Sequence, residues 1–190
     1  MADSRILLIR HSQSALDLNR PAAEWPLSLT GRSRATQFAA TIANYAPTYL
    51  YSSSETKAQE TAALIAAALD IPTSSWPGLQ EHDRREVTQM PADEFQANVK
   101  ALLQKPGEHV FGGETGSEVV NRFEKALAEL RTRHPGQTIA AVSHGTAITL
   151  FLAHHGLVDP VPYWQELRQP ALIVLAPDPW RLLATINPQW

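Results

Sequence analysis

The stretches LLIRHS, at residues 7–12, and AVSHG, at residues 141–145, decide the fold that this sequence predicts. In each, a short apolar run gives way to polar and histidine side chains, which is typical of a buried strand that ends in a turn. The carboxyl ends of neighbouring parallel strands share one edge of a sheet, and the turns leaving that edge form a common crevice. If both strands belong to one such sheet, Arg10, His11 and His144 converge on that crevice.

The composition indicates a globular protein and argues against several function classes. Of 190 residues, 44% are hydrophobic and 18% are charged, which argues against disorder and fits a single domain spanning residues 1–190. The net charge of -3 argues against a nucleic-acid partner. The chain has no cysteine, which excludes disulfides, cysteine nucleophiles and cysteine-based metal sites. No stretch approaches a membrane span or a secretion signal, so we expect a cytoplasmic protein without a membrane partner.

Short apolar runs alternate with amphipathic helical patterns along most of the chain. This alternation predicts the α/β class, as a three-layer α/β/α sandwich with a mostly parallel central sheet. Strands are expected at residues 6–9, 49–51 and 138–142, with a closing hairpin of residues 172–175 and 182–186. Helices are expected from a cap at Thr30, from a capping box at residues 52–55, over about 92–103, from a capping box of Thr115 and Glu118, and over 146–154.

Arg10 and His11 follow the first strand and precede a polar turn. Backbone N–H groups in such a turn, together with an arginine, make an anion pocket. A neutral imidazole there is able to attack phosphorus and carry it as phosphohistidine. Gly145 allows a tight turn beside His144, which is able to hydrogen-bond phosphate oxygens. Taken singly, each motif is also compatible with a purely structural role, as a strand-end cap or a satisfied histidine.

Further motifs occur between these two, in a fixed order. They are RHSQS at 10–14, LSLTG at 27–31, SSSETKAQETA at 52–62, LQE at 79–81, GET at 113–115 followed by Arg122, and SHG at 143–145. On these motifs the chain resembles the histidine phosphatase superfamily, which includes the cofactor-dependent phosphoglycerate mutases. The resemblance extends from about residue 7 to residue 145 and implies a phosphoglycerate mutase-like fold.

The resemblance also implies a role for each matched residue. His11 would be the nucleophile, and Arg10 and His144 would clamp the phosphoryl oxygens and neutralise their charge. Glu81 would protonate the leaving oxygen and later activate water, which requires a raised pKa and shielding from solvent. Without the motif, Glu81 reads as a solvated surface residue. The substrate-binding residues would be Ser12, Asp17, Lys57, Gly145 and Thr146.

Three of these positions depart from the family pattern. Lys57 stands where the family has a second phosphate-binding arginine, and it lacks the planar fork of a guanidinium. Ser12 replaces a glycine and adds a side chain where the backbone approaches the ligand. Asp17 replaces an asparagine, and its carboxylate would repel a phosphoryl group unless it is paired or points away. Together these departures put the catalytic rate and the substrate type in question.

Side chains outside the motifs give weaker signals. His82, Arg84 and Arg85 either contact the non-phosphate part of a substrate or form a solvated surface. His154 and His155 resemble a metal pair only superficially, so no metal and no cofactor are expected. Specificity is expected from residues 82–111, and the apolar hairpin near the C-terminus is a candidate homodimer surface.

Three functions remain open on the sequence. The first is a metal-independent phosphomonoester hydrolase that acts on a small phosphorylated metabolite through a phosphohistidine. The second is a catalytically weakened phospho-ligand binding or regulatory protein on the same fold, motivated by Ser12, Asp17 and Lys57. The third is a phosphoglycerate mutase, although the chain offers little extra length for the enclosing lid that a mutase needs.

Overall fold

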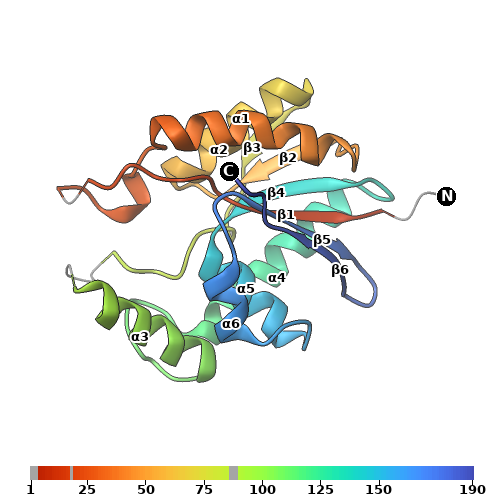
Figure 1. Cartoon of the computed structure of the whole chain (residues 1–190). Helices are drawn as coiled ribbons and strands as arrows, with labels where there is room; N and C mark the ends of the chain where they lie inside the picture. The colour runs from red at the N-terminus through yellow and green to blue at the C-terminus, as the bar shows by residue number, and fades with distance from the viewer. Residues whose placement is uncertain (1–3, 18, 86–89) are drawn as a thin grey trace.

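The central sheet has six strands in the order β3-β2-β4-β1-β5-β6 (Figure 1). The computed structural model describes residues 4–17, 19–85 and 90–190. Parallel pairing joins β3 to β2, β2 to β4 and β4 to β1, and β5 pairs antiparallel with β1 and with β6. The strands are β1 (Ile6–Arg10), β2 (Tyr49–Ser52), β3 (Thr73–Ser75), β4 (Ile139–Ser143), β5 (Ala171–Ala176) and β6 (Arg181–Ile186).

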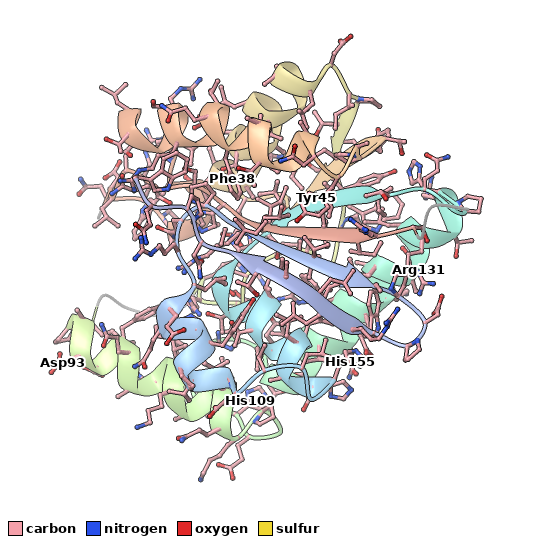
Figure 2. The ribbon with its side chains drawn as sticks, turned by 45° about the vertical axis from the view of Figure 1, so that its right-hand side comes forward. Phe38, Tyr45, Asp93, His109, Arg131 and His155 are labelled. Carbon is pink, nitrogen blue, oxygen red and sulfur yellow. The ribbon has the colours of Figure 1, made fainter. Side chains whose placement is uncertain are left out.

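Helices cover both faces of this sheet. Figure 1 shows α1 (Leu29–Ala43) and α2 (Thr56–Leu69) on one face, and α3 (Ala92–Gln104), α4 (Gly116–Arg133), α5 (Gly145–His154) and α6 (Pro160–Glu166) on the other. Alternate side chains of β1 belong to the two cores on opposite faces of the sheet. Leu7 and Ile9 pack under α1 and α2, whereas Ile6 and Leu8 pack against α4 and α5. Phe38 lies between α1 and the sheet (Figure 2) and is fully buried. The predicted α/β/α sandwich with a mostly parallel sheet is confirmed.

The register between β1 and β4 brings the two decisive stretches together. Arg10 lies opposite Ser143, and the amide of His11 donates to the carbonyl of Ser143 at 2.9 Å. The two strands therefore end at the same level, and the turns that carry His11 and His144 leave the sheet side by side.

Two of the predicted helix caps are wrong, although α2 begins at Thr56 as expected. Helix α1 begins one residue before Thr30 and is capped by Ser28, whose hydroxyl accepts from the amide of Gly31 at 2.9 Å. Helix α2 has no side-chain cap at Glu55. The hydroxyl of Ser53 bonds His144 instead, and the carboxylate of Glu55 accepts from Lys57 and from the amide of Glu81. The predicted capping box of Thr115 and Glu118 is confirmed and starts α4.

The elements that sequence patterns did not predict are short and polar or rich in proline. Strand β3 is an exposed edge strand of three polar residues, and α6 carries proline in its first turn. A 3-10 turn at Ala22–Glu24 precedes α1. No helix among the described residues is long and apolar enough to cross a membrane.

Candidate active site

The rings of His11 and His144 meet at the carboxyl ends of β1 and β4. Their centroids are 5.1 Å apart and the rings are tilted by 57°. His11 is 6% exposed and His144 is fully buried. The convergence expected from the two strand ends is therefore present, with both imidazoles largely withdrawn from water.

The turn after β1 fixes the tautomer of His11. Its Nδ1 lies 2.7 Å from the carbonyl oxygen of Ser12, and a carbonyl only accepts, so Nδ1 carries the ring proton. Burial lowers the pKa of His11 well below its usual value, and the neighbouring His144, Lys57 and Arg10 lower it further. At neutral pH the ring is thus uncharged, and its Nε2 holds a free lone pair, the state a nucleophilic imidazole requires.

Arg10 brings a guanidinium to the same strand end. Its Nη1 donates to the carbonyl of Leu167, and its Nε is buried without a hydrogen-bond partner among the described residues. A Cβ added to Gly145 would lie 3.0 Å from Cζ of Arg10, so only a glycine lets the guanidinium rest against the start of α5 undisturbed. Burial lowers the pKa of Arg10, but an arginine stays charged at neutral pH.

His144 is held from the β2 side. Its Nε2 lies 2.7 Å from the hydroxyl of Ser53 and 3.4 Å from Oε1 of Glu55. Its Nδ1 is buried and has no hydrogen-bond partner in the described part of the chain. Burial lowers the pKa of His144 to about 3, against the opposing effect of Glu81. This ring is also neutral at physiological pH.

Glu81 occupies the amino-terminal end of α5. Its carboxylate accepts from the amides of Thr146 at 3.2 Å and Ala147 at 2.9 Å, and from its neighbour His82 at 2.9 Å. Glu81 is therefore not a solvated surface residue. Burial raises its pKa, but Arg84, His144 and the backbone donors outweigh burial, and the net shift is downward. The expectation of a raised pKa for Glu81 is wrong, because the helix end stabilises the carboxylate.

A second carboxylate, that of Glu55, lies beside these groups, and the sequence analysis missed it. Its Oε2 accepts from Nζ of Lys57 at 2.6 Å, and its Oε1 accepts from the amide of Glu81 at 2.8 Å. Lys57 is buried and also donates to the carbonyl of Ala22 at 2.7 Å. The charge of Lys57 reaches both histidines and lowers their pKa values. The one available signal was the position of Glu55, two residues before Lys57 within the matched motif.

The other residues predicted to bind substrate have their polar groups largely engaged. The amide of Ser12 donates to Thr61 and its hydroxyl donates to the carbonyl of Gly31 at 2.7 Å, so its side chain turns toward α1. Asp17 pairs with Arg20 at 3.3 Å, which neutralises the carboxylate that the sequence analysis regarded as repulsive. The hydroxyl of Thr146 accepts from Arg84 at 2.8 Å.

Arg122 on α4 fixes the loop that carries Glu81. All five of its N–H donors are used: two bind the carboxylate of Glu114, and three bind the carbonyls of Gly78, Gln80 and Glu81 at 2.8–3.0 Å. Arg122 therefore acts on the site through the backbone of Glu81. We regard it as a positioning residue.

The basic residues after Glu81 have three different surroundings. His82 is buried and bonds the carbonyl of Glu114 at 2.7 Å, so the solvated interpretation is wrong for it. Arg84 lies 4.9 Å from the ring of Phe95 and 4.0 Å from the carboxylate of Glu81. Arg85 is exposed and pairs with Asp83 at 2.6 Å. Of the three side chains, that of Arg84 is the one that pairs with a residue of the candidate site. Within the stretch expected to set specificity, residues 86–89 lie outside the described residues.

Metal-binding geometry is not found in the described residues. No group of three or more histidine, aspartate or glutamate side chains there is arranged to hold a metal ion. His155 pairs with Glu124 at 2.7 Å and caps the carboxyl end of α5, whereas the candidate site lies at its amino end.

Known proteins match this chain over most of its length. The model of the histidine phosphatase superfamily (branch 1) matches residues 6–181. The chain is similar to the uncharacterized phosphatase PhoE of Bacillus subtilis (strain 168), with 24% identity over 182 residues, which cover 93% of this chain and 91% of that protein. It is also similar to the probable phosphoglycerate mutase GpmB of Photorhabdus laumondii subsp. laumondii, with 27% identity over 76% of this chain and 71% of that protein.

A solved structure shows the same fold. The phosphoserine phosphatase of Entamoeba histolytica, in complex with 3-phosphoglyceric acid, matches with a TM-score of 0.79 at 21% identity and covers 98% of each chain. The phosphoglycerate mutase-like fold expected from the sequence is confirmed.

Proposed function

Because the chain belongs to the histidine phosphatase superfamily, we propose that it is a metal-independent phosphomonoester hydrolase that acts on a small phosphorylated metabolite through a phosphohistidine on His11. The observation that carries the proposal is the hydrogen bond of 2.7 Å from Nδ1 of His11 to the carbonyl of Ser12. It leaves Nε2 as the lone-pair nitrogen of a neutral ring beside His144 and Arg10.

In the first step Nε2 of His11 attacks phosphorus and the bond from phosphorus to the ester oxygen breaks. Arg10 and His144 stabilise the charge on the phosphoryl oxygens, and Lys57 adds a positive field from the β2 side. The leaving oxygen takes a proton and departs as an alcohol. In the second step water attacks phosphorus, the bond to nitrogen breaks, and inorganic phosphate and free His11 are released.

The lowered pKa of Glu81 determines where the first proton comes from. Glu81 starts as a carboxylate, so the proton arrives with the substrate monoanion and stays on the phosphoryl group until the ester bond begins to break. As negative charge develops on the leaving oxygen, Glu81 relays this proton to it, and in the second step the carboxylate of Glu81 accepts a proton from the attacking water. Because a phosphomonoester loses its second proton near pH 6, we expect kcat/KM to fall as the pH rises above about 6.

The direct test is hydrolysis of p-nitrophenyl phosphate in excess EDTA by the wild type, His11→Ala and the control variant His109→Ala. His109 is exposed and distant from the site in the chain. We expect turnover by the wild type and by the control, and at least a thousandfold loss, roughly the scale of losing a nucleophile, for His11→Ala. Absence of turnover by the wild type, or turnover that persists in His11→Ala, overturns the proposal.

One observation favours the second candidate, a phospho-ligand binding or regulatory protein. The carboxylate of Glu55 already binds Lys57 and lies next to His144, so it competes with an incoming anion for both. Calorimetry with inorganic phosphate separates the candidates when it is combined with the assay. Binding without turnover, with activity gained in Lys57→Arg, supports the binding protein, whereas fast turnover by the wild type excludes it.

A further inference from the structure

A hollow lined by three arginines lies beside Arg10, at the same edge of the sheet as the candidate site. Its volume is about 340 Å³, and the residues that line it are Arg10, Arg34, Arg168, Gln13, Gln169, Leu167 and Trp190. No aspartate or glutamate is among the described residues that line it. This volume is at the lower end of the range for small-molecule sites, so the hollow suits one small group and not a macromolecule.

The topology of the sheet places this hollow next to His11. Arg10 pairs with Ala171 at the start of β5, so the segment just before β5, which contains Arg168 and Gln169, reaches the carboxyl end of β1. Gln13 follows His11 by two residues. Arg10 is shared between the hollow and the candidate phosphate site, so the two adjoin at this side chain.

Two of the arginines in the hollow have no acidic partner within the described part of the chain. Arg34 lies 5.7 Å from the ring of Trp190, and Figure 1 shows the C-terminus close to α1 in accordance with this contact. Arg168 has a hydrogen bond from its backbone amide to Asn187, and no ion pair of its side chain is found among these residues. By contrast Arg32, two residues before Arg34 on the same helix, pairs with Glu60 at 3.2 Å.

Unpaired guanidinium groups that converge on a hollow are a binding site for an anion. A planar guanidinium presents several donors in a fork that matches the oxygens of a carboxylate or phosphate. Trp190 and Leu167 supply apolar surface for the carbon chain between two charged ends of a ligand.

We propose that the hollow binds a second anionic group of the substrate, a carboxylate or a phosphate, while Arg10, His11 and His144 hold the phosphoryl group that is transferred. This inference rests on the proposed function and narrows it to substrates with two anionic ends. Arg34 and Arg168 are the specificity-determining residues, and Arg10 contributes to both ends.

The test compares two substrates that differ at one end only. Glycerate 3-phosphate carries a carboxylate where glycerol 3-phosphate carries a hydroxymethyl group. The wild type is expected to prefer glycerate 3-phosphate in kcat/KM by at least about tenfold, the effect of one charge-assisted hydrogen bond. The double variant Arg34→Gln/Arg168→Gln should lose that preference through KM and hydrolyse glycerol 3-phosphate within about twofold of the wild type.

Control variants and a bisphosphate sharpen the result. Arg32→Gln, from the same helix, should leave the preference unchanged, and Arg34→Lys should restore part of it. Replacing glycerate 3-phosphate by propane-1,3-diol bisphosphate shows whether the second group is a phosphate, by a larger preference than that for the carboxylate. No preference in the wild type for either anionic substrate, or an equal loss on all substrates in the double variant, overturns the inference.

Failure of the proposed function gives a different result. If the wild type hydrolyses none of these esters, calorimetry with glycerate 3-phosphate still tests the hollow. Binding that weakens at least about tenfold in the double variant upholds the inference without the hydrolase. Equal binding by the two proteins overturns it.

Discussion

The two halves of the candidate site are held in different ways. The half that carries His11 and His144 is fixed by paired strands, and the amide of His11 itself bonds the carbonyl of Ser143. The half that carries Glu81 lies on an irregular loop and is fixed by side chains, above all by Arg122. The nucleophile half therefore depends on the fold as a whole, whereas the acid–base half depends on a few polar contacts that single substitutions are able to break.

The largest effect should come from breaking the support of the loop. Arg122→Leu removes five donors, which takes the Arg122 hydrogen bonds from three carbonyls and leaves the carboxylate of Glu114 with the amide of Asp83 but without its ion pair. We expect a loss of about 2–4 kcal/mol in the free energy of unfolding, and a fall in kcat/KM of about a hundredfold because Glu81 loses its position. Urea titration and steady-state assays measure the two.

The matched control for this variant is Arg131→Leu on the same helix. Arg131 pairs with Asp178, whose side chain is mostly exposed, so the expected loss is below about 1 kcal/mol with unchanged activity. If Arg122→Leu behaves like Arg131→Leu, the loop is held by something other than Arg122.

The stability of the strand-held half should depend on pH. His11 and His144 both have lowered pKa values in the folded protein. Below pH 6.5 these two imidazoles therefore bind protons in the unfolded chain but remain unprotonated in the folded chain. Stability is therefore lost as the pH falls from about 6.5 toward the folded pKa of His144, which is about 3. His144 should contribute a loss of about 2 kcal/mol between pH 7 and pH 5, and His11 acts in the same direction.

Urea titrations at pH 7, 6 and 5 measure this dependence. His144→Asn should flatten it, whereas His154→Asn, at an exposed position on the same helix, should leave it unchanged. The lowered pKa of Glu81 acts in the same direction at lower pH, because its carboxylate stabilises the fold above about pH 4 and this contribution is lost on acidification. Equal slopes in the wild type and His144→Asn would contradict the neutral, buried state of this ring.

A smaller effect is expected where the halves touch. Gly145→Ala places a methyl group 3.0 Å from the guanidinium carbon of Arg10, and the guanidinium must shift away. We expect kcat/KM to fall about tenfold, because a small displacement of a positioned cation has a large effect on phosphoryl transfer. Gly107→Ala, where the added methyl group meets nothing within 4 Å, is the control and should keep full activity.

The smallest effect concerns the carboxylate that joins the halves. Glu55→Gln keeps an acceptor for the amide of Glu81 but removes the charge that Lys57 now neutralises. We expect competitive inhibition by inorganic phosphate to become about fivefold stronger, because the positive field of Lys57 is released. Glu60→Gln, which lies on α2 and pairs with Arg32, should not change the inhibition. Weaker inhibition in Glu55→Gln would show that Glu55 does not compete with the anion.

These two halves also differ in how far they could be predicted from sequence. The strand-end half was predictable, because an apolar run followed by a polar turn indicates the carboxyl end of a strand. In a parallel sheet these ends share one edge, which places Arg10, His11 and His144 together. The pattern could not specify the register between β1 and β4, and it is this register that places His11 beside Ser143.

For the loop-held half, the sequence predicted which residues belong to the site but not how they contact one another. The motif picked out Glu81 and Arg122, but their contact depends on how the loop at residues 78–81 is laid against α4, which no local pattern encodes. The same holds for Glu55, which the sequence suggested as a helix cap and which the fold places between Lys57 and the amide of Glu81. The pKa of Glu81 was misjudged for this reason, because the amides at the start of α5 were not known to reach it.

The central claim is that the sheet presents Nε2 of His11, and not Nδ1, to phosphorus. Rapid mixing of the wild type, labelled with ¹⁵N at histidine, with p-nitrophenyl phosphate and quenching in alkali should trap a phosphohistidine whose ³¹P–¹⁵N coupling and mass-mapped peptide identify Nε2 of His11. A phosphoryl group on Nδ1, on another residue, or on no residue at all during steady turnover would contradict the account.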